Sequence, residues 1–393
     1  MSARTDTAFG FDPWSTQFAA WPYDAYARLR EESPLTWFEP TQQWLVARHD
    51  DVSALVRDRR LGRTYLHRFT HEEMGRPEEP AETAGFWYLN RNGMLDREPP
   101  DHTRLRRLVS RAFTARVVEA LRPKVQAIVD GLVDDLIGAG EADLIATLAE
   151  PLPVEVIAEM LGIPGPDRHL LRPWSADICK MYELNPGPAT WRIASAAAVE
   201  FSDYLRALIR ERRVRAGDDL LSGLVNAVDE GDRLTEDELI GTVVLLLNAG
   251  HEATVNATGN GWLALFRNPD QLDVLRAGDA AALRTGIEEL LRYDTPLQMF
   301  ERWVLDDIEV AGHTIRRGAE VALSFGVTRA HNPHITFGAG IHYCLGAPLG
   351  RLELELSFGT LLRRAPRLEL AGEPVWKPGY VLHGLASLPV RCS

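Results

Sequence analysis

The spacing of apolar residues along the chain predicts a mainly helical protein. Residues 115–138 and 194–215 carry apolar side chains three and four positions apart, which is the spacing of an amphipathic helix. Residues 235–267 form the longest such run, and Thr235 followed by Glu238 makes the pattern of a capping box at its start. We therefore predict long helices over these three ranges.

Strand signals are shorter and fewer. They occur at "LTWFEP" (35–40), "QWLVARH" (43–49), "RWVLDDIEV" (302–310) and "AEVALSF" (319–325), with a second group near the C-terminus. The sequence shows no internal repeat and no low-complexity linker that would divide it. We expect a fold that is mainly α with a minor β part, organised as a single domain over residues 1–393.

Residues 66–101 lack a clear period and are interrupted by proline and glycine, so we expect an irregular segment there. A loop of that length inside a compact fold tends to be functional. It carries the aromatic residues Phe86, Trp87 and Tyr88. These side chains either line a pocket or pack in the core beneath the loop, and the sequence leaves both interpretations open.

Composition and charge exclude several classes of protein. Apolar residues make up 45% and charged residues 25%, and the net charge is −13, which argues against a nucleic-acid partner. The first residues do not resemble a signal peptide, and the apolar runs are shorter than the roughly 20 residues of a membrane span. Cys179, Cys344 and Cys392 are too scattered for a disulfide framework. We expect a cytoplasmic protein with no membrane partner.

One of these cysteines lies in an unusual place. Cys344 occurs in the glycine-broken stretch "ITFGAGIHYCLGAP" (335–348), immediately before a helix-like run that opens with Pro348. Backbone N–H groups at a helix start favour a thiolate, and glycines allow a flat ligand to approach closely, as haem ligation requires. The alternative is a buried cysteine near a helix start, and spacing alone gives the two equal weight.

The residues around Cys344 support the first interpretation. The pattern Phe337-x-x-Gly340-x-His342-x-Cys344-x-Gly346 resembles the haem-ligand signature of the cytochromes P450, which is a highly specific motif. The resemblance is to the soluble bacterial type. It implies the cytochrome P450 fold, haem b as the cofactor and Cys344 as the axial ligand of the iron.

Two further segments resemble the same family, and the similarity runs from about Trp21 to Val390. Glu289 and Arg292 match the Glu-x-x-Arg pair of the K helix, which implies a structural ion pair. By itself such a pair is more often a solvated salt bridge. Residues 245–257, "LLLNAGHEATVNA", are similar to the oxygen-binding I helix.

The resemblance also implies how the cofactor is held. His102, Arg106, Arg302 and His342 match positions that bind the haem propionates, and buried carboxylates need such partners. The full set of implied haem contacts is His102, Arg106, Ala249, Arg302, Phe337, Gly338, His342, Cys344 and Gly346.

The chain departs from the family pattern at two places. Most members have a threonine after the acidic residue of the I helix, whereas here Glu252 is followed by Ala253 and then Thr254. An alanine offers no hydroxyl, and Thr254 lies about 100° further round the helix. The proton source is then ordered water, Glu252 or a substrate hydroxyl. The second departure is a shorter segment after Ser324 than the family normally has.

The resemblance implies a monooxygenase that inserts one oxygen atom of O2 into a small organic substrate. We expect hydroxylation in secondary metabolism of the polyketide or antibiotic type, with the substrate either free or tethered to a carrier protein. The alternative is a P450-like haem protein that acts as a non-catalytic partner or scaffold. The expected substrate pocket comprises Phe86, Trp87, Asn248, Leu297, Met299 and Leu382.

Electrons must come from another protein, because the sequence contains no flavin or nicotinamide fingerprint. The resemblance implies a ferredoxin and a ferredoxin reductase as partners of a monomeric enzyme. Positive charge in the segment 104–116 could dock an acidic ferredoxin, although a solvated helix face is the alternative. The charges are those of Arg104, Arg106, Arg107, Arg111 and Arg116.

Overall fold

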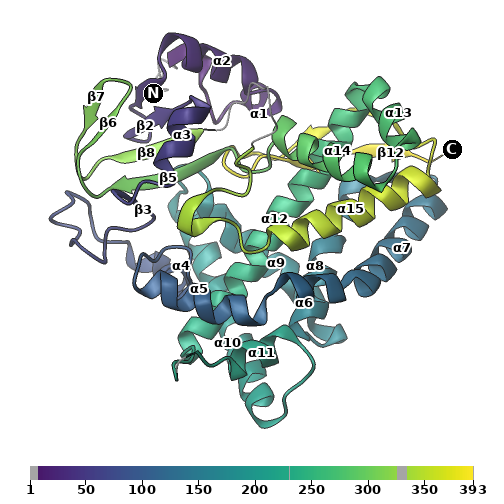
Figure 1. Ribbon diagram of the computed structural model, residues 1–393, viewed down its shortest axis with the longest axis horizontal. Helices are drawn as coiled ribbons and strands as arrows, with labels where there is room; N and C mark the ends of the chain where they lie inside the picture. Colours follow the sequence, from purple (N-terminus) through teal and green to yellow (C-terminus); the bar gives the residue numbers. More distant parts are fainter. Residues whose placement is uncertain (1–7, 230, 325–333, 393) are drawn as a thin grey trace.

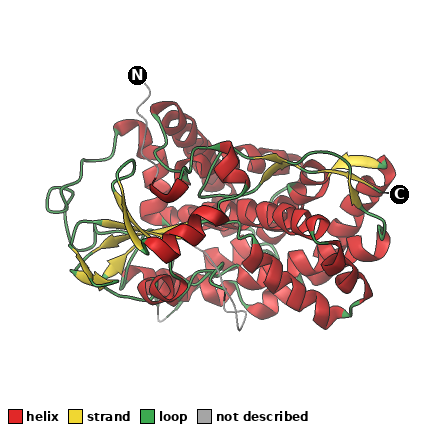
Figure 2. Cartoon of the chain, turned by 90° about the horizontal axis from the view of Figure 1, so that it is seen from above, coloured by secondary structure: helices red, strands yellow, loops and turns green. Residues whose placement is uncertain are grey.

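The computed structural model describes residues 8–229, 231–324 and 334–392 of the chain. Helices make up most of it, and the larger sheet lies at one end of the molecule (Figures 1 and 2). The predicted class, mainly α with a minor β part, is confirmed. The α-helices are α1 (Thr16–Ala20), α2 (Tyr23–Glu32), α3 (His49–Leu55), α4 (Ala84–Asn92), α5 (Asp101–Ala112), α6 (Ala115–Ala120), α7 (Arg122–Ala139), α8 (Pro151–Leu161), α9 (Leu171–Cys179), α10 (Pro188–Val214), α11 (Leu220–Asn226), α12 (Glu236–Arg267), α13 (Pro269–Ala277), α14 (Ala280–Tyr293) and α15 (Ala347–Arg364).

Short helical turns connect several of these helices. They are η1 (Ala8–Gly10), η2 (Ala81–Thr83), η3 (Ile145–Ala149, a π-helical turn), η4 (Gly165–Leu170), η5 (Lys180–Tyr182) and η6 (Gly340–His342).

The long helix α12 passes through the centre of the molecule (Figure 1). Its N-terminus has the predicted capping box, in which Thr235 accepts from the N–H of Glu238 and the Glu238 carboxylate accepts from the N–H of Thr235. Most of the helix is buried in the largest hydrophobic core. Trp262 stacks on Phe358 of α15 with the ring centroids 5.0 Å apart, which fixes these two helices against each other.

The three predicted helices are present with altered bounds. The range 115–138 is divided into α6 and α7, because Pro123 begins a new helical turn after Leu121. Helix α10 begins at Pro188, ahead of the predicted start. Helix α12 ends at Arg267, as predicted.

Within the described ranges, the strands form four sheets. The largest has the order β1-β2-β8-β5-β3, and its β2–β8 pair is parallel while the others are antiparallel. The predicted strand over 302–310 is divided into β5 and β6. The strands are β1 (Leu35–Phe38), β2 (Gln43–Val46), β3 (Leu61–Gly62), β4 (Glu141–Asp143), β5 (Met299–Val304), β6 (Ile308–Val310), β7 (His313–Ile315), β8 (Glu320–Ser324), β9 (Glu369–Leu370), β10 (Val375–Trp376), β11 (Leu385–Ser387) and β12 (Pro389–Arg391).

The prediction of an irregular segment over 66–101 was wrong for residues 81–92, which form η2 and α4. The helix is short, and polar residues interrupt its apolar periodicity. Asn90 is one of them; it is buried, and its side chain donates to the carbonyl of Phe86 at 2.9 Å. Gly85 lies so close to α10 that a Cβ there would be 2.5 Å from the carbonyl oxygen of Ser195. Tertiary packing therefore stabilises this helix.

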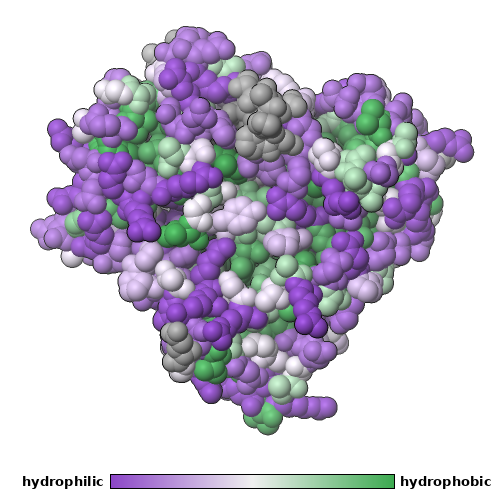
Figure 3. Space-filling view, in the orientation of Figure 1, coloured by the Kyte–Doolittle hydropathy of each residue, from purple (hydrophilic) through white to green (hydrophobic). Residues whose placement is uncertain are grey.

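The surface is predominantly hydrophilic on the face shown in Figure 3. Among the described residues, no helix combines the length and the apolar composition needed to cross a bilayer. The shorter segment after Ser324 lies at residues outside the described ranges.

Candidate functional site

The loop that carries Cys344 folds back on itself. Gly338 and Gly340 adopt positive φ angles of 67° and 68°, a conformation that favours glycine. The N–H of Cys344 donates to the carbonyl of Phe337 at 2.9 Å, which closes the loop. Helix α15 begins directly afterwards, with Gly346 as its N-cap residue. The spacing from Phe337 to Cys344 in the signature is thus that of a closed turn, which places the sulfur at its end.

The sulfur of Cys344 faces the start of α15. It accepts from the backbone N–H groups of Gly346 and Ala347, and Arg106 lies near enough to favour the thiolate. Burial is nevertheless the largest effect and raises the pKa of the Cys344 thiol above its ordinary value. A metal ion bound to the sulfur would reverse this balance, which Arg106 alone does not. The loop therefore has the properties of a ligand that ionises when iron binds.

Four cationic or ionisable side chains meet beside this loop. His102 of α5 and His342 of η6 have their ring centroids 4.4 Å apart. Arg302 of β5 is 5% exposed, and its NH1 donates to the carbonyl of Glu301 at 2.8 Å. Arg106 donates to the carbonyl of Tyr343 at 2.6 Å. The structure thus brings together the residues that the sequence predicted as propionate contacts.

Among the described residues, the acidic side chain paired directly with this cluster is Glu98, which lies against His342. Both ring nitrogens of His102 are buried without a hydrogen-bond partner among the described residues. Burial, His342 and Arg106 lower the pKa of His102 to about 4. Burial, with Arg63 nearby, lowers the pKa of Arg302 to about 9. Buried donors of this kind need acceptors, and the two carboxylates of haem would supply them.

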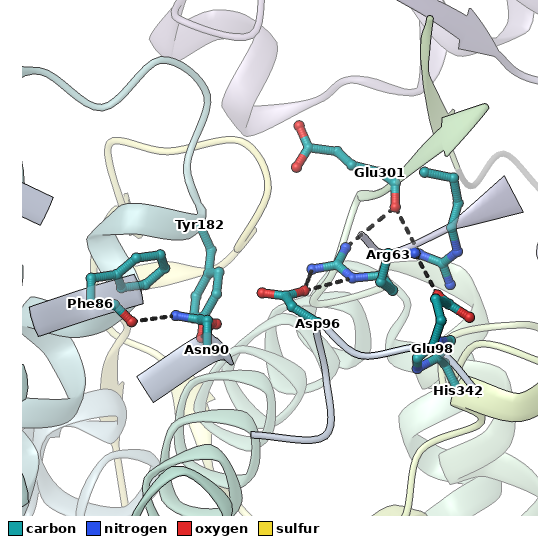
Figure 4. A network of polar contacts seen from close by, with 9 residues as sticks. Arg63, Phe86, Asn90, Asp96, Glu98, Tyr182, Glu301 and His342 are labelled. Atoms are coloured by element: carbon teal, nitrogen blue, oxygen red, sulfur yellow. Dashed lines mark hydrogen bonds and ion pairs between the residues drawn. The ribbon is translucent and has the colours of Figure 1, made fainter. Parts of the chain in front are cut away.

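A second polar network adjoins the cluster and was missed from the sequence. Figure 4 shows Arg63 between Asp96 and the carbonyl of Glu301, at 2.9 and 3.3 Å. Glu98 accepts from the N–H of Arg63 at 2.7 Å, and its Oε1 lies 3.3 Å from Nε2 of His342. Glu98 thereby fixes the ring of His342. Nothing in the local sequence links Arg63 to these partners, so no spacing rule could have found them.

The middle of α12 is accessible although its flanks are buried. Ala249 is exposed and Ala253 is partly exposed, and the two lie one helical turn apart on the same face. Thr254 is buried, and its hydroxyl faces α15. A Cβ on Gly350 of that helix would be 4.0 Å from the hydroxyl oxygen of Thr254. Its hydroxyl contacts the buried Glu353 of α15. Thr254 therefore does not replace the hydroxyl that Ala253 lacks.

Glu252 has a partner that the sequence did not reveal. Lys377, in the loop between β10 and β11, donates to the Glu252 carboxylate at 2.8 Å and to Oδ1 of Asn256 at 3.1 Å. Burial raises the pKa of Glu252, but Lys377 and His251 outweigh it, so the net effect is a lowered pKa. Glu252 is therefore an ionised and anchored carboxylate at neutral pH.

The residues expected to line the substrate pocket form two groups. Leu297 and Leu382 pair in a β-bridge, and Met299 follows on β5. Asn248 of α12 borders a small cavity, while Phe86 lies in the main core beside the rings of Trp87 and Tyr182. The cavity is lined by Leu89, Asn90, Gly93, Leu95, Ile178, Tyr182, Gly241, Val244, Leu245 and Asn248.

Glu289 and Arg292 form the ion pair that the sequence suggested. The guanidinium donates to both carboxylate oxygens at 2.6 and 2.7 Å. The side chain of Arg292 is 5% exposed, whereas that of Glu289 is 34% exposed. The pair is therefore only half buried.

The arginines of α5 are less available for docking than predicted. Arg104 pairs with Glu238 and Asp232, and both Arg107 and Arg111 pair with Asp229. Intrachain carboxylates thus neutralise much of the positive charge on this helix.

The cysteine loop, the cationic cluster and the accessible strip on α12 fit a haem with a thiolate ligand. They come from α5, α12, β5 and the loop before α15, and each feature is incomplete without such a group. The fold and the site together define a haem-thiolate protein.

Comparison with known proteins agrees. No family model matches the chain. It is 42% identical over 400 residues to the cytochrome P450 monooxygenase PikC of Streptomyces venezuelae, covering 95% of this chain and 92% of that protein. It is 37% identical over 409 residues to the polyketide biosynthesis cytochrome P450 PksS of Bacillus subtilis, covering 98% of both. The structure of P450BioI in complex with acyl carrier protein carrying hexadec-9Z-enoic acid has a TM-score of 0.88 at 32% identity, covering 96% of this chain and 99% of that one.

The chain belongs to the cytochrome P450 family. The predicted fold, the haem b cofactor and the monooxygenase activity are confirmed. The alternative of a non-catalytic haem protein is set aside, since PikC is named as a monooxygenase.

Proposed function

We propose that this enzyme hydroxylates a small organic molecule of the polyketide or antibiotic type. The observation that carries the substrate class is the similarity to PikC and to the polyketide biosynthesis enzyme PksS over nearly the whole chain. The likeness to P450BioI, whose structure includes an acyl carrier protein, supports testing substrates tethered to a carrier as well as free ones. Haem b, when bound, supplies the activation of dioxygen.

In this proposal, the residues of this chain hold the haem, orient the substrate and deliver protons. Cys344 is the proposed iron ligand, and the other proposed haem contacts are those predicted from the sequence. His102, Arg106, Arg302 and His342 would bind the propionates, because they form the buried cationic cluster. Glu289 and Arg292 are structural in this proposal.

Proton delivery is the part of the mechanism that this chain alters. Ala253 has no hydroxyl, and the hydroxyl of Thr254 is turned toward Glu353. Two sources remain in our proposal: water held by the Glu252 carboxylate, or a hydroxyl of the substrate itself. Ala253→Thr separates them. If water is the source, coupling of reductant use to product is kept or improved, whereas a substrate hydroxyl at this place would clash with the added bulk and activity would fall.

The partners follow from the absence of a reductase motif in the sequence. We propose a ferredoxin and a ferredoxin reductase as the electron donors of a monomeric, single-domain, cytoplasmic enzyme. Arg104, Arg107 and Arg111 pair with acidic residues and Arg106 is assigned to the propionates, so the exposed Arg116 is the charge of that segment to test in ferredoxin binding.

A substrate panel tests the proposal. Macrolactones, linear polyketides and acyl chains, each free and carrier-bound, are added to the purified haem-loaded protein, and the shift of the Soret band toward the high-spin form is recorded. A hit is then turned over with a ferredoxin and its reductase, and the product is identified by mass spectrometry. Binding and oxidation confined to unrelated compounds, such as steroids, would overturn the proposed class.

A further inference from the structure

Glu183 makes an unusual set of contacts across the molecule. It follows η5, in the turn between α9 and α10. Its carboxylate accepts from three consecutive backbone N–H groups in the loop between β10 and β11, those of Tyr380 at 2.8 Å, Val381 at 3.0 Å and Leu382 at 2.9 Å. A carboxylate is the group best suited to a row of converging N–H donors.

The loop is shaped to receive this carboxylate. A Cβ on Gly379 would be 2.9 Å from Oε1 and 3.0 Å from Cδ of Glu183, so a side chain there would displace the carboxylate. Gly379 is therefore explained by close approach rather than by a positive φ. The contact requires both the acid at 183 and the missing side chain at 379.

The opposite side of the loop is held by a different segment. The N–H of Gln298 donates to the carbonyl of Val381 at 3.0 Å, and Leu297 pairs with Leu382. Residues 380–382 thus lie between the segment that follows α14 and the turn between α9 and α10. Leu184, the neighbour of Glu183, packs in the same hydrophobic cluster as Val381. On the α9–α10 side, the polar contact comes from the Glu183 carboxylate.

We infer that Glu183 is a positioning residue for substrate binding. Its carboxylate fastens the α9–α10 turn to the loop that carries Leu382 and sets the place of that side chain in the pocket. Breaking the three hydrogen bonds lets the two segments separate. The inference rests on the proposed function and on the pocket expected from the sequence, in which Leu297, Met299 and Leu382 face the substrate.

The first test is hydrogen exchange of the haem-loaded enzyme. In Glu183→Gln, the amide oxygen can no longer accept from all three donors, and the N–H groups of 380–382 should exchange at least tenfold faster. Gly379→Ala keeps the acid but pushes it away, and it should give the same result. The matched control is Glu200→Gln, an exposed carboxylate on α10 that bonds to Trp174, and it should leave exchange at 380–382 unchanged. Unaltered exchange in both test variants would overturn the contact.

The second test separates positioning from mere structure. 4-Phenylimidazole binds haem iron through its nitrogen, so stopped-flow Soret spectroscopy reports its association and dissociation without knowledge of the natural substrate. Both rates should rise about tenfold in Glu183→Gln and Gly379→Ala, and the double variant should add little. With a turned-over substrate, KM should rise while kcat stays near the parent value. Faster exchange with unchanged ligand rates and KM would leave a purely structural contact and overturn the positioning role.

The two tests also distinguish this inference from the proposed function. A failure of the polyketide panel leaves the exchange and phenylimidazole results standing. Unchanged ligand rates would refute the role of Glu183 even if a polyketide is oxidised.

Discussion

Replacing Arg302 should stabilise the haem-free protein and weaken the haem-loaded one. Burial lowers the pKa of this guanidinium far below its ordinary range, to about 9, at a residue that is 5% exposed, which corresponds to a penalty on the order of 5 kcal/mol for the charged form. In the haem-free protein the charge has a backbone carbonyl as acceptor and a second arginine, Arg63, nearby. The attraction of Glu98, Asp96 and Glu301 does not offset its burial. Arg302→Met removes the charge and keeps most of the side-chain volume, so the free energy of unfolding of the haem-free protein should rise by about 1–4 kcal/mol.

The pH at which this is measured matters. The unfolded chain holds the Arg302 proton to a pH far above 9, whereas the folded chain releases it near pH 9. The penalty is therefore fully present at pH 7 and is relieved only as the pH rises through 9. Urea unfolding of haem-free protein at pH 7, followed by tryptophan fluorescence, measures it.

The haem-loaded protein should respond in the opposite sense. A hydrogen bond between charged groups contributes about 1.5–3 kcal/mol, so loss of the Arg302 contact should speed haem transfer to apomyoglobin about 10- to 100-fold. The control is Arg316→Met, a side chain 76% exposed whose surface ion pair with Asp307 contributes little to stability. If Arg302→Met leaves haem transfer unchanged, Arg302 is not a propionate partner, and if it destabilises the haem-free protein, the burial penalty is refuted.

Three other test variants and one control examine the remaining assignments. Cys344→Ser should lose the red-shifted Soret band of the reduced carbon monoxide complex, and Cys179→Ser should keep it; an unchanged spectrum in the first would refute the ligand. Glu289→Ala should leave Arg292 without its carboxylate partner, cost about 3 kcal/mol and lower haem content; a folded, haem-replete but inactive variant would contradict a structural role. Burial raises the pKa of Glu353 to about 8, so the native state keeps a proton that the unfolded chain releases near pH 4.5. The stability that this residue confers should therefore fall as the pH rises from about 4.5 to about 8. If the difference in melting temperature between the parent and Glu353→Gln does not change with pH, this prediction is refuted.

Local patterns in the sequence predicted the parts of the protein that depend on local interactions. The capping box at Thr235 and the closed turn around Cys344 each involve residues a few positions apart, so their spacing carries the geometry. The ion pair between Glu252 and Lys377 joins residues that are remote in the chain, and no period or motif encodes it.

The same limit explains the miss at α4. That helix is stabilised by packing of Gly85 against α10 and by side-chain bonds such as that of Asn90, neither of which produces an amphipathic period. The expected substrate pocket stays a prediction, since Phe86 lies in the core and Leu297 and Leu382 meet only through tertiary pairing, which no local pattern encodes.

The scattering of the haem contacts along the chain bears on how the protein matures. His102 is translated long before Arg302, and Cys344 follows later still. At about 5–20 residues per second, the ribosome needs roughly 10–50 seconds to pass from the first of these residues to the last. Strand β4 must also wait for its antiparallel partner β12. The cationic cluster and the cysteine loop can therefore meet only after Cys344 has been translated, and we expect cofactor insertion at a late stage of maturation.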